Sequence, residues 1–209
     1  MKADAMVTAS IALAASAAVL VPGAGAAGED LMAGKVDTGR TISLEATVDA
    51  PASTVFGLWT TEAGIQSFFA PRAVIDPRVG GRYEIAFIPE ADPEGESHGT
   101  KGARILRFEP DRALSFEWFT FVSRELSAVA PPGATGPPVV PAAVRNARPI
   151  PTWVDLSLTP VAGQPGKTHV RLEHRGFESG SPWDESFEYF WRAWATVLGR
   201  LGARCAHGA

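Results

Sequence analysis

The segment ESFEYFWRAWATVLGRL, residues 185–201, carries an unusual density of aromatic side chains near the end of the chain. Five of them fall within eight positions: Phe187, Tyr189, Phe190, Trp191 and Trp194. Large apolar residues also recur at intervals of three and four, at Phe187, Phe190, Trp194, Val197 and Leu201. That spacing places them on one face of a helix. The segment therefore predicts a long closing helix whose aromatic face must be covered by another element.

The residues that could cover this helix are predicted to be β-strands. Residues 40–48 alternate between apolar and polar side chains, which indicates a half-buried strand. Three hairpins are then predicted, in residues 72–89, 99–121 and 151–177. Their turns are expected at Gly80-Gly81, at Pro110-Asp111 and from Gly163 to Gly166. In the second and third hairpins, alternation places Glu117 and Asp155 on the outward face of their strands.

Two short helices are predicted between the first strand and the hairpins, in residues 51–69. Asp49 is expected to help cap the first helix, and Gly64 is expected to separate it from the second, which Pro71 ends. The predicted order is one strand, two helices, six strands and the long helix. This predicts an α+β fold, in which a curved antiparallel sheet of about seven strands wraps around the C-terminal helix.

Residues 1–27 are predicted to be an export signal. Lys2 precedes an apolar run over residues 6–21, and Ala24-Gly25-Ala26 offers a small-x-small cleavage site. The run is Ala-rich and shorter than the ~20 apolar residues that a membrane span needs, so cleavage is expected rather than a retained anchor. The predicted location is the periplasm or the cell exterior.

The remaining boundaries follow from composition. Residues 28–39 are interpreted as a leader, residues 40–203 as the folded domain and residues 204–209 as a tail. Within the domain, residues 122–150 form a Pro/Gly-rich insertion, predicted to be a loop at the sheet edge or a lid.

Charge and composition exclude several classes of protein. The net charge of the 209 residues is -4 and no basic stripe is present, so nucleic acid is not expected as a partner. Cys205 is the only cysteine, which excludes an intrachain disulfide and a thiolate metal cluster. The four histidines show no pair at ligand spacing, so neither a metal site nor a cofactor is predicted.

Five segments follow one another in an order that resembles a known family. They are residues 50–71, 76–87 with its Arg-x-Gly-Gly turn, 99–118, 168–177 with its His-x-Gly-hydrophobic end, and 189–201. Together they resemble the helix-grip fold of the START-like, or SRPBCC, superfamily, in the branch of homologues of the activator of the heat-shock chaperone ATPase (AHSA-type). Ala193 stands where that branch usually has glycine, and residues 122–150 exceed its usual pattern. An exported protein would not meet a cytosolic chaperone, so chaperone activation is not expected.

The resemblance implies that a small apolar or aromatic molecule is held between the last helix and the sheet. The residues expected to line that site are Phe68, Phe69, Tyr83, Phe87, Phe116, Trp118, Trp153, His174, Phe190, Trp191 and Trp194. Aromatic rings bury a large area and stack on flat ligands. Ligand binding is therefore the leading hypothesis.

Two other functions remain open at this stage. In a cyclase or lyase of the kind found in the superfamily, His174 or Tyr83 would carry a proton, since alternation places His174 on the inward side of its strand. Alternatively, the aromatic side chains fill the interior, and the protein is a protein-interaction module. Nothing in the sequence predicts the oligomeric state.

Overall fold

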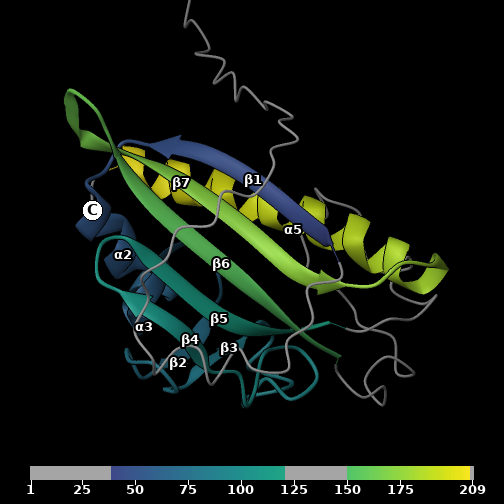
Figure 1. The fold of residues 1–209 in the computed structure, drawn as a ribbon. Helices are drawn as coiled ribbons and strands as arrows, with labels where there is room; N and C mark the ends of the chain where they lie inside the picture. The colour runs from purple at the N-terminus through teal and green to yellow at the C-terminus, as the bar shows by residue number, and fades with distance from the viewer. Residues whose placement is uncertain (1–38, 121–149, 208–209) are drawn as a thin grey trace, which may run out of the picture.

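The computed structural model describes residues 39–120 and 150–207 (Figure 1). In chain order these residues form β1 (Arg40–Val48), α2 (Ala52–Thr60), α3 (Glu62–Phe68), β2 (Arg72–Ile75), β3 (Tyr83–Ala86), β4 (Ile105–Glu109), β5 (Ala113–Thr120), β6 (Ile150–Val161), β7 (Gln164–Phe177) and α5 (Ser181–Ala206). The predicted order of elements is confirmed. The predicted export signal, nearly all of the leader, and the insertion up to residue 149 lie outside the described residues.

The seven strands form two antiparallel sheets rather than one. The larger sheet has the order β1-β7-β6-β5-β4, and β2 pairs only with β3. The two sheets meet at an isolated bridge between Arg82 and Arg104. The backbone N–H of Ile105 donates to Gly81 O at 2.9 Å, and the N–H of Tyr83 donates to Ala103 O at 2.8 Å. The strands pair over too few residues at this junction to form a continuous ladder. The single sheet predicted from the sequence is therefore divided into a five-stranded and a two-stranded sheet.

Helix α5 lies along one face of the five-stranded sheet, beside β1 and β7 (Figure 1). Its predicted apolar face is buried most completely in the C-terminal half, where Trp194 and Leu201 are at most 1% exposed. Phe187 and Phe190 nearer the start are only partly buried. The helix-grip arrangement predicted from the sequence is confirmed. No helix within the described ranges has the length and apolar character needed to cross a membrane.

The helix also continues past the expected end of the domain at residue 203. It ends at Ala206, and Cys205 in its last turn is 5% exposed. Burial raises the pKa of the Cys205 thiol. The cysteine is therefore a core residue of the helix rather than part of an exposed tail.

The junction between α2 and α3 differs from the prediction. Thr61, rather than Gly64, separates the helices, and its Oγ1 accepts the N–H of Gly64 at 3.0 Å as an N-cap. Gly64 lies inside α3, where a Cβ would be 2.5 Å from the carbonyl oxygen of Leu58. The glycine is therefore needed because the two helices approach closely. Asp49 does not cap α2 and instead pairs with Lys167 at 3.1 Å.

All three predicted hairpins are confirmed, β2-β3, β4-β5 and β6-β7. The third turn is tighter than predicted. It consists of Ala162 and Gly163, because β7 begins at Gln164 and includes Gly166. The two-residue turn fits the strong twist of a long hairpin.

Candidate functional site

Trp118 on β5 lies at the centre of an aromatic cluster beneath α5. The indole is 4% exposed. The ring centroids nearest to it belong to Trp194 at 4.9 Å, Phe69 at 6.0 Å, Phe116 at 6.1 Å, Phe87 at 6.2 Å, Phe190 at 6.3 Å and His174 at 6.5 Å. Most of these contacts are edge-to-face, the geometry that the quadrupoles of aromatic rings favour. The cluster joins side chains from β5, β7, α5 and the segments that follow α3 and β3.

Most of the predicted lining residues belong to this one cluster. Ring contacts link Phe68, Phe69, Tyr83, Phe87, Phe116, Trp118, His174, Phe190 and Trp194. Trp191 is partly buried and packs against the edge of the core. Phe87 and Phe190 are also only partly buried. Both rings contact Trp118 and keep some exposure, and they are called the rim rings below.

Trp153 is the exception, and its predicted position between helix and sheet is wrong. On β6 the residues Val154 and Leu156 belong to the core cluster, whereas Trp153 does not. Successive side chains of a strand point to opposite faces, so Trp153 shares the outward face with Asp155. Its ring packs over Gly176, where an added Cβ would be 2.9 Å from Cζ3 of the indole. The alternation that assigned Asp155 to the outward face predicts this position for Trp153 as well.

His174 is completely buried, and both of its ring nitrogens are engaged. The Nε1–H of Trp194 donates to Nδ1 at 2.9 Å, so Nδ1 carries no proton. The Nε2–H then donates to Oγ1 of Thr152 at 2.8 Å. The Thr152 hydroxyl in turn donates to the carbonyl oxygen of Trp118 at 3.0 Å. This chain of bonds fixes one neutral tautomer and leaves no proton of the imidazole free for transfer.

The surroundings of His174 and Tyr83 favour their uncharged forms. Burial lowers the pKa of His174 to about 3, because the imidazolium would lose its hydration. Burial also raises the pKa of Tyr83, whose hydroxyl donates to the carbonyl oxygen of Trp59 at 2.9 Å. His174 and Tyr83, the proton carriers predicted for a cyclase or lyase, therefore form hydrogen bonds with other groups of the protein interior.

The depressed pKa of His174 predicts a loss of stability in mild acid. In the unfolded chain the histidine binds a proton below about pH 6.5, whereas the folded protein resists protonation down to about pH 3. The contribution of His174 to stability is therefore complete above pH 6.5 and is lost progressively as the pH falls. Between pH 7.5 and 5.5 the free energy of unfolding should decrease by about 1.4 kcal/mol from this group alone.

Urea unfolding at these two pH values measures the change, and carboxyl groups contribute little in this interval. NMR of the imidazole carbons gives an independent check. A resonance of His174 that titrates with a midpoint near pH 6.5 would contradict the prediction.

Two buried residues of this region, Trp59 and Thr152, are missing from the lining predicted from the sequence. Trp59 of α2 is 1% exposed and contacts Phe68, Phe69 and Phe116. The position of Trp59 on its helix predicted that the side chain is buried. The sequence did not predict that it contacts the rings of the cluster. Thr152 precedes Trp153 on β6, and strand alternation alone places it inward.

Two indole N–H groups in the interior have no hydrogen-bond acceptor within the described residues, Nε1 of Trp59 and Nε1 of Trp118. Buried polar groups are nearly always paired in folded proteins. Leaving a buried donor without an acceptor costs about 1–3 kcal/mol. The unpaired indole of Trp118 therefore requires a physical explanation.

Two surface hollows are lined mainly by residues outside this cluster. One of about 360 Å³ lies between α3 and the end of α5, lined by Ser67, Phe68, Arg200, Ala203, Arg204 and His207. Another of about 120 Å³ lies beside β2 and β3. Of the predicted lining residues, only Phe68 borders either hollow.

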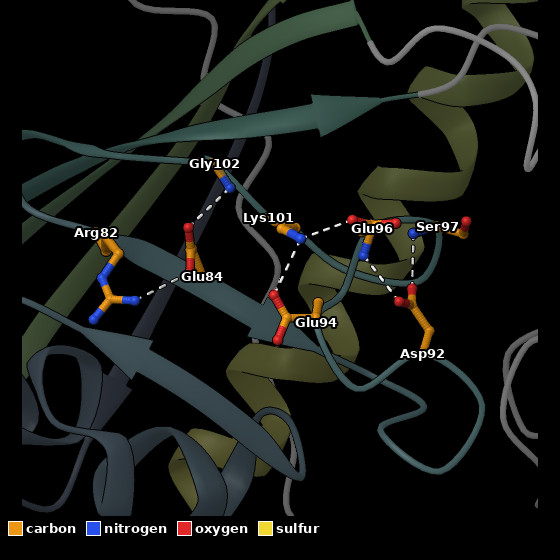
Figure 2. Close-up of polar contacts among 8 residues, drawn as sticks. All are labelled: Arg82, Glu84, Asp92, Glu94, Glu96, Ser97, Lys101 and Gly102. Carbon is orange, nitrogen blue, oxygen red and sulfur yellow. Dashed lines mark hydrogen bonds and ion pairs between the residues drawn. The ribbon is translucent and has the colours of Figure 1, made fainter.

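A polar network organises the loop between β3 and β4, near the smaller hollow (Figure 2). Lys101 pairs with Glu94 at 3.1 Å and with Glu96 at 2.7 Å. The carboxylate of Asp92 accepts backbone N–H groups, from Glu96 at 3.0 Å and from Ser97 at 2.7 Å. Burial by itself raises the pKa of Asp92, but these and a further backbone bond outweigh it and lower the pKa. The network therefore stabilises the loop.

Arg78 and Arg82, which flank the glycine turn, pair with carboxylates close to them in sequence. Arg78 lies 2.8 Å from Asp76, and Arg82 lies 3.9 Å from Glu84. Glu84 also accepts the N–H of Gly102 (Figure 2). In the part of the chain that the structure describes, no group of three or more His, Cys, Asp or Glu residues is placed to hold a metal ion.

Comparison with known proteins agrees with this architecture. The family model described as "Activator of Hsp90 ATPase homolog 1-like protein" matches residues 49–204. No curated protein matches the sequence significantly.

Several solved structures share the fold. Protein MLL2253 from Mesorhizobium loti is 19% identical and superposes with a TM-score of 0.57, over 81% of this chain and 99% of that chain. The Aha1 dimer from Colwellia psychrerythraea is 13% identical with a TM-score of 0.51, over 79% and 96% of the two chains. DynU16, described as a protein of the dynemicin biosynthetic locus, is 18% identical with a TM-score of 0.53, over 80% and 48%.

These identities are too low to transfer a ligand or a reaction from any one structure. The family model covers most of the chain, from just before α2 almost to the end of α5. The chain therefore belongs to the family of proteins like the activator of Hsp90 ATPase homolog 1, within the SRPBCC helix-grip superfamily.

Proposed function

We propose that this protein binds a small apolar or aromatic molecule non-covalently between α5 and the sheet. The observation that carries the proposal is Trp118, a buried indole whose N–H has no acceptor among the described residues and whose ring contacts the partly buried rings of Phe87 and Phe190. A flat molecule that moved these two rings apart would reach a surface made of aromatic rings and one N–H donor. The fold of the family, which accommodates small molecules in this region, supports the same assignment.

The hydrogen bonds of His174 argue against an enzymatic role for that residue. A proton carrier near neutral pH needs a pKa close to the working pH and a proton within reach of the substrate. His174 has a pKa of about 3, and both ring nitrogens are bonded to side chains of the protein. We therefore favour binding over a cyclase or lyase reaction.

A filled interior that serves a protein-interaction module is the second candidate. The close ring contacts favour it, for example Tyr83 with Phe116 at 4.2 Å and Trp118 with Trp194 at 4.9 Å. In that case the aromatic residues stabilise the domain and no small molecule enters. The two candidates can be distinguished by replacing a rim residue. The replacement weakens the binding of a small molecule only if the first candidate is correct.

The test is a thermal-shift screen of the purified protein with neutral flat aromatic compounds, followed by titration of the best compound. Replacing Phe190 with Ala removes a rim ring and should weaken binding at least fivefold. Phe108→Ala is the matched control, because that partly buried ring contacts Phe56 of α2 instead. If no compound raises the melting temperature, the interaction module becomes the better assignment.

We also propose that the protein is exported, because residues 1–27 have the features of a cleaved signal. Native mass spectrometry of the protein purified from its source tests both proposals. A mass lacking residues 1–26 would support export, and an additional mass lost on denaturation would be the bound molecule. A chain of full length in the cytosolic fraction would rule out export.

A further inference from the structure

The aromatic cluster contains buried N–H donors that have no acceptor among the described residues. Within the aromatic cluster of the described residues, Nε1 of Trp59 and Nε1 of Trp118 are buried and have no hydrogen-bond partner. The third indole of the cluster, Trp194, donates to His174. A bound molecule can form a hydrogen bond with such an N–H only if the molecule carries an acceptor. A molecule that carries only donors leaves the N–H unpaired.

Trp118 is better placed than Trp59 to meet an incoming molecule. Trp118 contacts both rim rings, Phe87 at 6.2 Å and Phe190 at 6.3 Å between ring centroids. Trp59 is 1% exposed, and its ring neighbours are Phe68, Phe69 and Phe116. A molecule that enters past the rim therefore meets Trp118 first.

The same interior offers nothing to balance a charge. The buried polar side chains of the described residues are threonines, serines and His174, and none is Asp, Glu, Lys or Arg. The pKa of His174, about 3, keeps its imidazole neutral. A charged molecule would lose its hydration without gaining a partner of opposite charge.

We infer that the molecule bound in the interior is uncharged and flat and carries a hydrogen-bond acceptor, a carbonyl or ether oxygen, that accepts the N–H of Trp118. This inference rests on the proposed binding function, which it makes more specific. Rim rings enclose the body of the ligand, and the single donor of Trp118 sets its orientation.

The test uses two compounds of nearly the same shape, 9-fluorenone, which has a ketone oxygen, and fluorene, which has none. Isothermal titration of the full chain should show that fluorenone binds about five- to tenfold more tightly, the usual value of one hydrogen bond. Trp118→Phe keeps a ring but removes the donor, and the preference should disappear. Trp153→Phe is the matched control, because the same substitution on the outward face should preserve the preference.

A second measurement does not depend on whether Trp118→Phe folds. In protein labelled with ¹⁵N at the indoles, the assigned Nε1–H signal of Trp118 should move downfield with fluorenone but not with fluorene. Equal affinities for the two compounds, or an unmoved Trp118 signal with fluorenone bound, would overturn the acceptor inference while binding itself stands. If neither compound binds, the proposed binding function fails, and the inference fails with it.

Discussion

Replacing Trp194 with Ala is expected to lower the free energy of unfolding by about 4 kcal/mol. The indole is 1% exposed and lies 4.9 Å from the ring of Trp118 and 5.6 Å from that of Phe69. Its removal leaves a cavity beneath α5 that these stacked rings cannot collapse to fill. It also deprives Nδ1 of His174 of the one donor that the described residues offer it, which adds the cost of an unpaired buried acceptor.

Trp194→Phe separates the two contributions. Most of the packing is retained, and the expected loss is about 2 kcal/mol, largely from the orphaned His174 nitrogen. Trp191→Ala is the control on the same helix, because that side chain is only partly buried at the core edge. Urea unfolding followed by circular dichroism measures all three variants. If Trp191→Ala costs as much as Trp194→Ala, the placement of Trp194 rather than Trp191 in the core is wrong.

Gly81→Ala is expected to cost about 3 kcal/mol, because the backbone has no room for a methyl group there. A Cβ at this position would be 2.1 Å from the carbonyl oxygen of Asp76 and 2.9 Å from that of Arg78. Both obstacles are backbone atoms and cannot rotate away. The carbonyl of Gly81 also accepts the N–H of Ile105, so a shift of the turn would weaken the junction between the two sheets.

The control for this substitution is Gly166→Ala in β7. An added Cβ there meets nothing within 4 Å, and the residue is exposed. Its free energy of unfolding should stay within about 0.5 kcal/mol of the wild type. Hydrogen exchange of the Ile105 amide provides a local measurement, and it should accelerate in Gly81→Ala only. Equal stability of the two variants would show that the turn can open without cost.

Gly80 and Gly81 show which features of a turn can be predicted from the sequence and which cannot. The Gly80-Gly81 pair indicated a turn, and a turn lies there. Gly80 has φ of +76°, as such turns require, whereas Gly81 is needed because the carbonyl of Asp76 lies against it. The first requirement is local and visible in a sequence. The second depends on where another backbone segment passes.

Trp153 and His174 show the same division within the candidate site. Strand alternation was sufficient to place His174 inward, and it would also have placed Trp153 outward. Alternation could not show that Nδ1 of His174 accepts from Trp194, which lies on another element. That bond decides whether the histidine is a candidate base or a neutral core residue.

The order of the elements, the hairpins, the long helix and the buried face of that helix could all be predicted from the sequence. These features depend on periodicity over a few neighbouring residues, since side chains repeat every two positions in a strand and every 3.6 in a helix. The tertiary structure was needed to show that the strands divide into two sheets, that His174 is neutral and that no described residue accepts the indole N–H of Trp118. Each of these depends on distances between atoms of residues far apart in the chain, which packing sets and local periodicity does not.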